Sequence, residues 1–113
     1  MTEKKYTWHK IAASEAELSF SNNLTCAQAN EKKVTIAKHN NKLFACAYTC
    51  PHAGGILHEG YVDAIGNIVC PVHRYKFSLL NGRNITGEGY YLKTFPVSIT
   101  NEGVFIGFEE KVF

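Results

Sequence analysis

Short runs of apolar and β-branched residues, separated by turn-forming residues, recur along most of this chain. Residues 6–11 form a first run that combines aromatic and β-branched side chains, which is typical of a strand. Residues 34–37 and 43–48 form two further runs on either side of Asn40-Asn41. Asparagine pairs favour tight turns, so this segment predicts a β-hairpin.

The same pattern continues toward the C-terminus. The further predicted strands and turns are residues 61–63 and 68–69 around 65–67, residues 76–80 before Asn81-Gly82, and residues 95–99 and 104–108 around 101–103. Only residues 12–18 suggest a helical turn, and that segment is short. Short strands at nearly regular spacing predict an all-β fold, a compact antiparallel barrel or sandwich. With 113 residues and no linker or repeat, we expect a single domain, 1–113.

Composition narrows the function classes only a little. The net charge is +2 with both signs mixed along the chain, so no basic patch indicates nucleic-acid binding. The first residues lack the apolar core of a signal peptide, and no apolar run approaches the roughly 20 residues that span a bilayer. We therefore expect a cytoplasmic protein without membrane insertion. In that compartment the four cysteines are expected to be thiols or metal ligands.

Two short clusters carry the candidate chemistry. Cys50 and His52 form a C-x-H pair, and Cys70 and His73 form a C-x-x-H pair. Two thiolates and two imidazoles can hold a two-iron, two-sulfur cluster in which the cysteines bind one iron and the histidines the other. Zinc also accepts two Cys and two His, but its usual C-x₂₋₄-C spacing differs from C-x-H. The interpretation as an iron–sulfur cluster is favoured, and zinc remains the chemical alternative.

The two clusters and the residues around them resemble the Rieske iron–sulfur family. The first segment fits the pattern C-x-H-x-G-x-x-L-x-x-G at Cys50, His52, Gly54, Leu57 and Gly60. The second segment fits C-P-x-H at Cys70, Pro71 and His73. The resemblance, which extends more weakly to both ends of the chain, implies three stacked antiparallel sheets. It also implies a cluster-binding subdomain of approximately residues 48–80, with both His ligands near the surface.

Some positions depart from the high-potential members of that family. Those members carry an additional cysteine in each segment, and the matching positions here resemble Gly55 and Val72, so no disulfide can form between the loops. They also carry Ser and Tyr hydroxyls that bond to sulfur, whereas this chain has Tyr75 and Phe77. Fewer donors to sulfur stabilise the reduced cluster less. We therefore expect a reduction potential that is low for a Rieske centre.

The resemblance implies a one-electron carrier with no catalytic residues of its own. The first hypothesis is a ferredoxin that links a flavin reductase to a terminal oxygenase. The second is the small subunit of a nitrite-reductase-like oxidoreductase complex, which shares this fold but often lacks the cluster ligands. The third is a zinc-stabilised β interaction module. The sequence names neither the redox partners nor the oligomeric state.

The remaining candidates have weaker signals. Cys26 and Cys46 have no partner motif and are expected to be buried thiols that pack as small apolar groups. His58 follows the first motif and is interpreted as a loop residue rather than a proton acceptor. Arg74, Lys76 and Arg83 follow the second motif, and they form either a rim that steers an acidic partner or ordinary surface charge.

Overall fold

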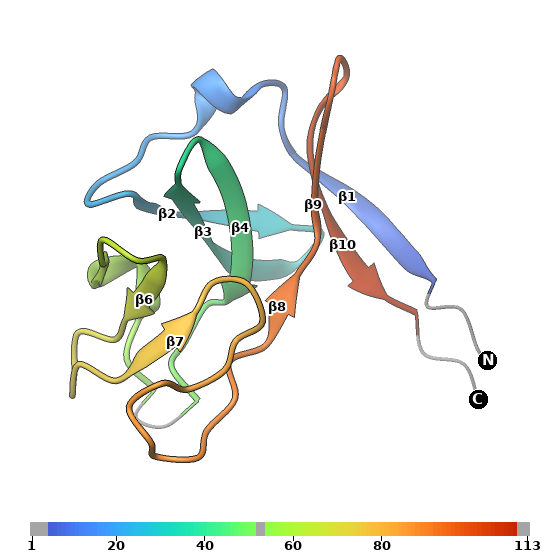
Figure 1. The fold of residues 1–113 in the computed structure, drawn as a ribbon. Coiled ribbons are helices and arrows are strands. Elements are labelled where there is room, and N and C mark those ends of the chain that lie inside the picture. Colours follow the sequence, from blue (N-terminus) through green and yellow to red (C-terminus); the bar gives the residue numbers. More distant parts are fainter. Residues whose placement is uncertain (1–4, 52–53, 111–113) are drawn as a thin grey trace.

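The computed structural model describes residues 5–51 and 54–110. Within these ranges the secondary structure consists of strands joined by turns and loops, with two short 3₁₀ turns (Figure 1). The elements are β1 (Tyr6–Ala12), η1 (Glu15–Glu17), β2 (Leu24–Ala29), β3 (Lys32–His39), β4 (Lys42–Ala47), η2 (Leu57–Glu59), β5 (Tyr61–Val62), β6 (Asn67–Val69), β7 (Lys76–Ser78), β8 (Thr94–Phe95), β9 (Val97–Thr100) and β10 (Gly103–Glu109). No helix among the described residues is long and apolar enough to cross a membrane.

The strands form three antiparallel sheets, as the resemblance to the Rieske iron–sulfur family implies. Their strand orders are β1-β10-β9, β2-β3-β4-β8 and β5-β6-β7. Figure 1 shows the four-stranded sheet between the β1–β10 ribbon and the small sheet that contains β6 and β7. One cysteine-containing loop follows β4 of the central sheet, and the other connects β6 to β7 of the small sheet.

The central sheet buries apolar side chains on both faces. In β3, Ala37 belongs to the core shared with the small sheet, and Val34 and Ile36 belong to the core shared with β10. Alternate residues of a strand point to opposite faces, so a strand covered on both sides has a continuous buried run. Residues 34–37 of β3 are all buried. Packing on both faces fixes the small sheet relative to the rest of the described chain.

Two parts of the strand prediction were wrong. Residues 95–99 do not form one strand, because Pro96 separates β8, which pairs with β4, from β9, which pairs with β10. Proline lacks the N–H that a ladder requires, and here the chain passes from one sheet to the next. The sequence reading also missed β2, whose pairing with β3 compensates for its polar and alanine-rich sequence. Residues 12–18 contain the last residue of β1, Ala12, and the single 3₁₀ turn η1 in place of a longer helix.

The two cysteines outside the motifs differ in burial. Cys46 on β4 is buried, as predicted, in the core beside the small sheet. Cys26 was expected to be buried, but its thiol is exposed. Cys26 lies in the middle of β2, an edge strand of the central sheet, and it belongs to neither apolar core, whereas Leu24 and Ala29 at the ends of the same strand are buried.

Burial of Cys46 should make the stability of the fold sensitive to alkaline pH. Burial raises the pKa of this thiol from 9.0 to about 12. Between these values the unfolded chain loses the proton while the folded chain keeps it, so stability present below pH 9 is lost as pH rises. Between these two pKa values, we expect Cys46 to lower the free energy of unfolding by up to about 1.4 kcal/mol for each unit that the pH rises.

Urea unfolding measured across this pH range checks the prediction. The Cys46→Ala variant should show a shallower pH dependence than the natural protein, and Cys26→Ala provides the control for loss of an exposed thiol. Parallel curves for Cys46→Ala and the natural protein would contradict the assignment.

Candidate metal centre

The loop that follows β4 folds back on Cys50 through two backbone hydrogen bonds. The Cys50 N–H donates to the Gly55 carbonyl at 2.7 Å, and the Gly54 N–H donates to the Cys50 carbonyl at 3.0 Å. Gly54 has φ +67°, a left-handed conformation that favours glycine. The loop therefore turns tightly around the cysteine and leads its chain back toward the small sheet.

The loop that follows β6 repeats this arrangement around Cys70. The Cys70 N–H donates to the Tyr75 carbonyl at 2.9 Å, and the Arg74 N–H donates to the Cys70 carbonyl at 2.9 Å. Arg74 has φ +59°, so it occupies the left-handed position that Gly54 holds in the first loop. Each cysteine thus begins a turn with the same hydrogen bonds to the fourth and fifth residues after it.

The two loops bring their thiols together in the protein interior. Cys50 is 2% exposed and Cys70 is 1% exposed, and both belong to the core beside the small sheet. Burial raises the pKa of the Cys70 thiol, and the neighbouring Cys50 thiol raises it further. The backbone N–H groups of Val72 and His73 donate hydrogen bonds to the Cys70 sulfur and lower its pKa in part. Such donors stabilise a thiolate that binds a metal.

Gly55 allows the two loops to approach each other. A Cβ added to Gly55 would lie 2.5 Å from Cγ2 of Val72 and 3.1 Å from the Cys70 sulfur. Gly55, five residues after Cys50, is therefore the point at which the Cys50 loop contacts the Cys70 loop. A residue with a Cβ at this position would require the Val72 side chain or the two loops to shift.

Of the two predicted imidazole ligands, the structure describes only one. His73 is exposed at the surface, three residues after the buried Cys70. His52 lies outside the described residues. Within the described ranges no group of three or more His, Cys, Asp or Glu side chains is placed to hold a metal ion. The set of four ligands, Cys50, His52, Cys70 and His73, therefore stays a prediction.

Comparison with known proteins decides the family. The family model described as the Rieske [2Fe-2S] domain matches residues 7–96. This chain belongs to the Rieske [2Fe-2S] domain family. The paired buried thiols, the N–H donors at Cys70 and the close approach at Gly55 fit the sulfur-ligand side of such a cluster.

Two curated relatives share part of the Rieske domain sequence. The ferredoxin component of the alkene monooxygenase system of Xanthobacter autotrophicus is 32% identical over 79 residues, which cover 70% of this chain and 65% of the relative. A Rieske domain-containing protein of Homo sapiens is 34% identical over 97 residues, which cover 83% of this chain and 58% of the relative. This chain therefore spans less than two thirds of either relative.

Solved structures share the fold of this Rieske domain. The ferredoxin of carbazole 1,9a-dioxygenase from Nocardioides aromaticivorans superimposes with a TM-score of 0.76 at 19% identity, covering 88% of this chain and 96% of that one. A Mycobacterium tuberculosis protein described by similarity as the small subunit of an NADH-dependent nitrite reductase gives a TM-score of 0.77 at 17% identity, covering 91% of this chain and 96% of that one. At these identities the likeness establishes the fold.

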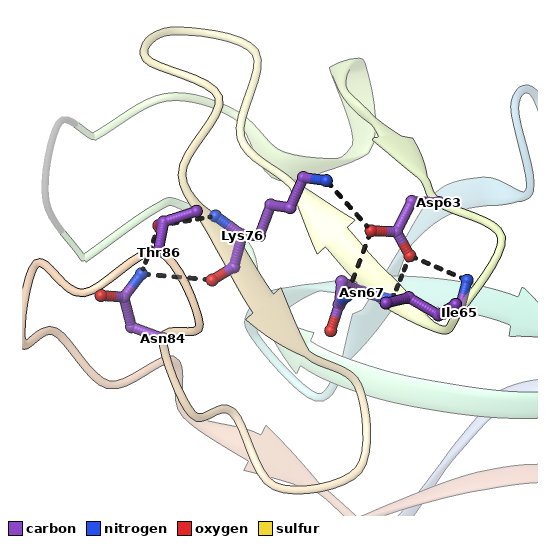
Figure 2. Close-up of polar contacts among 6 residues, drawn as sticks. All are labelled: Asp63, Ile65, Asn67, Lys76, Asn84 and Thr86. Atoms are coloured by element: carbon purple, nitrogen blue, oxygen red, sulfur yellow. Dashed lines mark hydrogen bonds and ion pairs between the residues drawn. The ribbon is translucent and has the colours of Figure 1, made fainter.

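Asp63 holds together the turn that precedes β6, and sequence reasoning missed its role (Figure 2). Its carboxylate accepts hydrogen bonds from the backbone N–H groups of Ile65 and Asn67 and from the Asn67 side chain. The Lys76 Nζ lies 3.4 Å from Asp63 Oδ2 and links β7 to the same turn. The available signal was an Asp at the start of a turn of the form D-A-I-G-N.

A second group of hydrogen bonds organises the segment after β7. The Asn84 amide donates to the Lys76 carbonyl at 3.1 Å, and its oxygen accepts the N–H groups of Glu88 and Gly89 (Figure 2 shows the contact between Asn84 and Lys76). The following Tyr90 ring stacks on Tyr75 with ring centroids 6.3 Å apart. The Tyr75 ring in turn lies 5.9 Å from that of His73. An ordered loop thus supports the exposed histidine from one side.

Substituting Gly55 should separate the two loops of the Rieske domain. Gly55→Ala places a methyl group against Val72 and Cys70, which we expect to lower the free energy of unfolding by about 1–3 kcal/mol. It should also make the Cys70 thiol of metal-free protein more reactive toward a thiol reagent such as Ellman's reagent.

The Gly54→Ala variant is the matched control. A Cβ at Gly54 meets nothing within 4 Å, so this variant carries only the backbone strain of a positive φ. If both variants left the thiol equally protected, the contact at Gly55 would not be what keeps the loops in register.

Removing the charge of Asp63 should destabilise the small sheet at neutral pH. Burial favours a higher pKa for this carboxyl, but the hydrogen bonds from Asn67, Ile65 and Lys76 outweigh it and hold the pKa below the ordinary 3.8. We expect Asp63→Asn to lower the free energy of unfolding by about 1 kcal/mol at pH 7. The loss is this small because solvent screens the ion pair with Lys76, whose side chain is partly exposed.

The pH dependence of this loss is a further check. A lowered pKa stabilises the fold above pH 3.8, and that stabilisation disappears as pH falls through the folded-state pKa. The difference between Asp63→Asn and the natural protein should therefore shrink in acid, whereas Glu59→Gln, at an exposed carboxylate nearby, is the control. A difference that stays constant down to strongly acidic pH would exclude the charge as its source.

Proposed function

We propose that this protein is a one-electron carrier, a Rieske ferredoxin, rather than an enzyme with a substrate of its own. Cys50 and Cys70 would bind the inner iron of a [2Fe–2S] cluster, and His52 and His73 would bind the outer iron. The observation that carries the proposal is the pair of matched loops that bury two thiols together beside an exposed His73. The family match over residues 7–96 supports it.

The proposed cluster would supply reversible one-electron chemistry, and the protein would supply its environment. The buried cysteine side excludes water, while the Val72 and His73 N–H groups favour a thiolate at Cys70. The exposed imidazole of His73 gives a partner protein access to the other side. The subdomain of approximately residues 48–80 would thus bind the cluster, within a single domain of residues 1–113.

The names of similar proteins favour oxygenase systems as partners. One relative is the ferredoxin component of an alkene monooxygenase system, and another is the ferredoxin subunit of a 3-phenylpropionate/cinnamic acid dioxygenase. A solved structure with the same fold is a complex of oxygenase and ferredoxin in carbazole 1,9a-dioxygenase. We infer that this chain carries electrons in the cytoplasm from a flavin reductase to a terminal oxygenase.

The small subunit of a nitrite-reductase-like complex is the second candidate. The observation in its favour is the fold shared with the nitrite reductase small subunit from Mycobacterium tuberculosis. The two candidates differ in assembly, because a subunit stays bound to its large partner whereas a ferredoxin dissociates between electron transfers. Stable co-purification with a large flavin or sirohaem subunit would favour the second candidate.

Spectroscopy of anaerobically purified protein tests the centre directly. We expect two irons and two acid-labile sulfides per chain, visible absorption and a Rieske-type EPR signal in the reduced state. His73→Ala should abolish that signal, because it removes a ligand of the outer iron. His58→Ala, which alters a half-buried ring packed 5.6 Å from Tyr48, is the control and should keep the signal. One zinc and no iron would overturn the proposal.

The potential of the proposed centre should lie toward the low end of the roughly −150 to +300 mV Rieske range. Phe77 is fully buried and brings no hydroxyl to the sulfur ligands, and Tyr75 contacts the rings of His73 and Tyr90. A redox titration followed by visible absorption measures the midpoint. A strongly positive value would mean that other donors stabilise the reduced state.

A further inference from the structure

Arg74 is the exception among the left-handed residues of this chain. Within the described ranges, the other non-glycine residues with positive φ are all asparagines, namely Asn22, Asn23, Asn30, Asn40 and Asn41. Asparagine visits this conformation readily because its short side chain bonds to the local backbone. The arginine side chain makes no such local bond, so Arg74, in the loop after β6, has a backbone conformation that is unfavourable for arginine.

The turn itself does not require an arginine. The loop around Cys50 has the same hydrogen bonds, and Gly54 occupies the corresponding left-handed position. A strained residue that a glycine could replace without strain is frequently retained for what its side chain does. The side chain of Arg74 therefore needs a reason other than the fold.

The guanidinium of Arg74 is an exposed charge beside the proposed ligand His73. Among the described residues its side chain forms none of the ion pairs or hydrogen bonds of the structure. Nearby charges are already engaged: Lys76 pairs with Asp63, and the Glu88 carboxylate accepts hydrogen bonds from Asn84 and Thr86. Arg74 thus presents a positive charge to solvent at the edge where an electron would leave.

We propose that Arg74 is a docking contact that binds an acidic group on the redox partner next to His73. This inference rests on the proposed function and specifies the chemistry of the partner surface. A guanidinium offers several N–H donors in a planar fork that matches a carboxylate. Its charge attracts an acidic surface during diffusion, and its hydrogen bonds orient that surface against the imidazole.

Small inorganic oxidants of opposite charge test the proposal without a known partner. The reduced protein is mixed in a stopped-flow instrument with hexacyanoferrate(III), an anion, or with tris(phenanthroline)cobalt(III), a cation. The variants are Arg74→Gly, which removes the charge and suits the left-handed backbone, and Arg74→Lys, which keeps the charge. The control is Lys42→Gln, an exposed charge beside Ile65 and Gly66, at the end of β6 away from Cys70.

At about 0.01 M salt, where the Debye length is roughly 30 Å, Arg74→Gly should slow oxidation by the anion roughly three- to tenfold and accelerate oxidation by the cation. Both effects should shrink at about 1 M salt. Arg74→Lys should keep most of the preference for the anion, and Lys42→Gln should change both rates little. Arg74→Gly should also resist urea at least as well as the natural protein, which separates loss of charge from loss of fold.

Two other outcomes have separate meanings. An intact Rieske-type spectrum in Arg74→Gly with unchanged rates for both oxidants would overturn the docking role and leave the electron-carrier function standing. Equal slowing of both oxidants would show a change at the cluster rather than at a docking charge, and it would overturn the docking role as well. Natural protein that binds no iron–sulfur cluster would contradict the proposed function itself.

Discussion

The candidate centre depends on holding the thiols of Cys50 and Cys70 together out of contact with water. Two buried sulfur ligands repel each other once they ionise, and burial disfavours the charged form of each. Backbone N–H donors, and a metal when one is bound, offset that cost. The protein meets the requirement by using the same turn twice and letting the turns touch at Gly55, where an added Cβ would contact Val72 and the Cys70 sulfur.

This geometry needs a rigid support, because the Cys50 loop begins after β4 of the central sheet and the Cys70 loop joins the short strands β6 and β7 of the small sheet. The central sheet supplies part of it by packing Ala37 and Cys46 in the same core as the two proposed ligands, Cys50 and Cys70. The Asp63 carboxylate supplies another part, since it joins the turn before β6 to Lys76 on β7. Charge-assisted hydrogen bonds are therefore placed on both strands that flank Cys70.

The sequence predicted the parts of this arrangement that depend on local patterns. The strands β3 and β4 follow from the apolar runs on either side of Asn40-Asn41, and the two motifs place Cys50 and Cys70 in loops. The sequence-based prediction failed where pairing between distant strands determines the secondary structure. Leu24–Ala29 has a weak strand sequence that β3 stabilises, and Pro96 divides a run of apolar residues between two sheets. Cys26 is exposed while Leu24 and Ala29 of the same strand are buried, a difference that depends on which parts of β2 are covered by other elements and that no local pattern reports.

The left-handed backbone at Arg74 was also beyond local prediction, because the segment H-R-Y contains no turn-forming residue. It follows from the hydrogen bonds that Cys70 must make with the fourth and fifth residues after it, whatever those residues are. The two loops therefore share a backbone and differ in their side chains. The loop with Gly54 and Gly55 lets the other approach, while the loop with Arg74 and Tyr75 extends toward the surface beside His73. The same turn thus gives close packing between the loops at Gly55 and, in the proposed function, places Arg74 at the surface where a partner would bind.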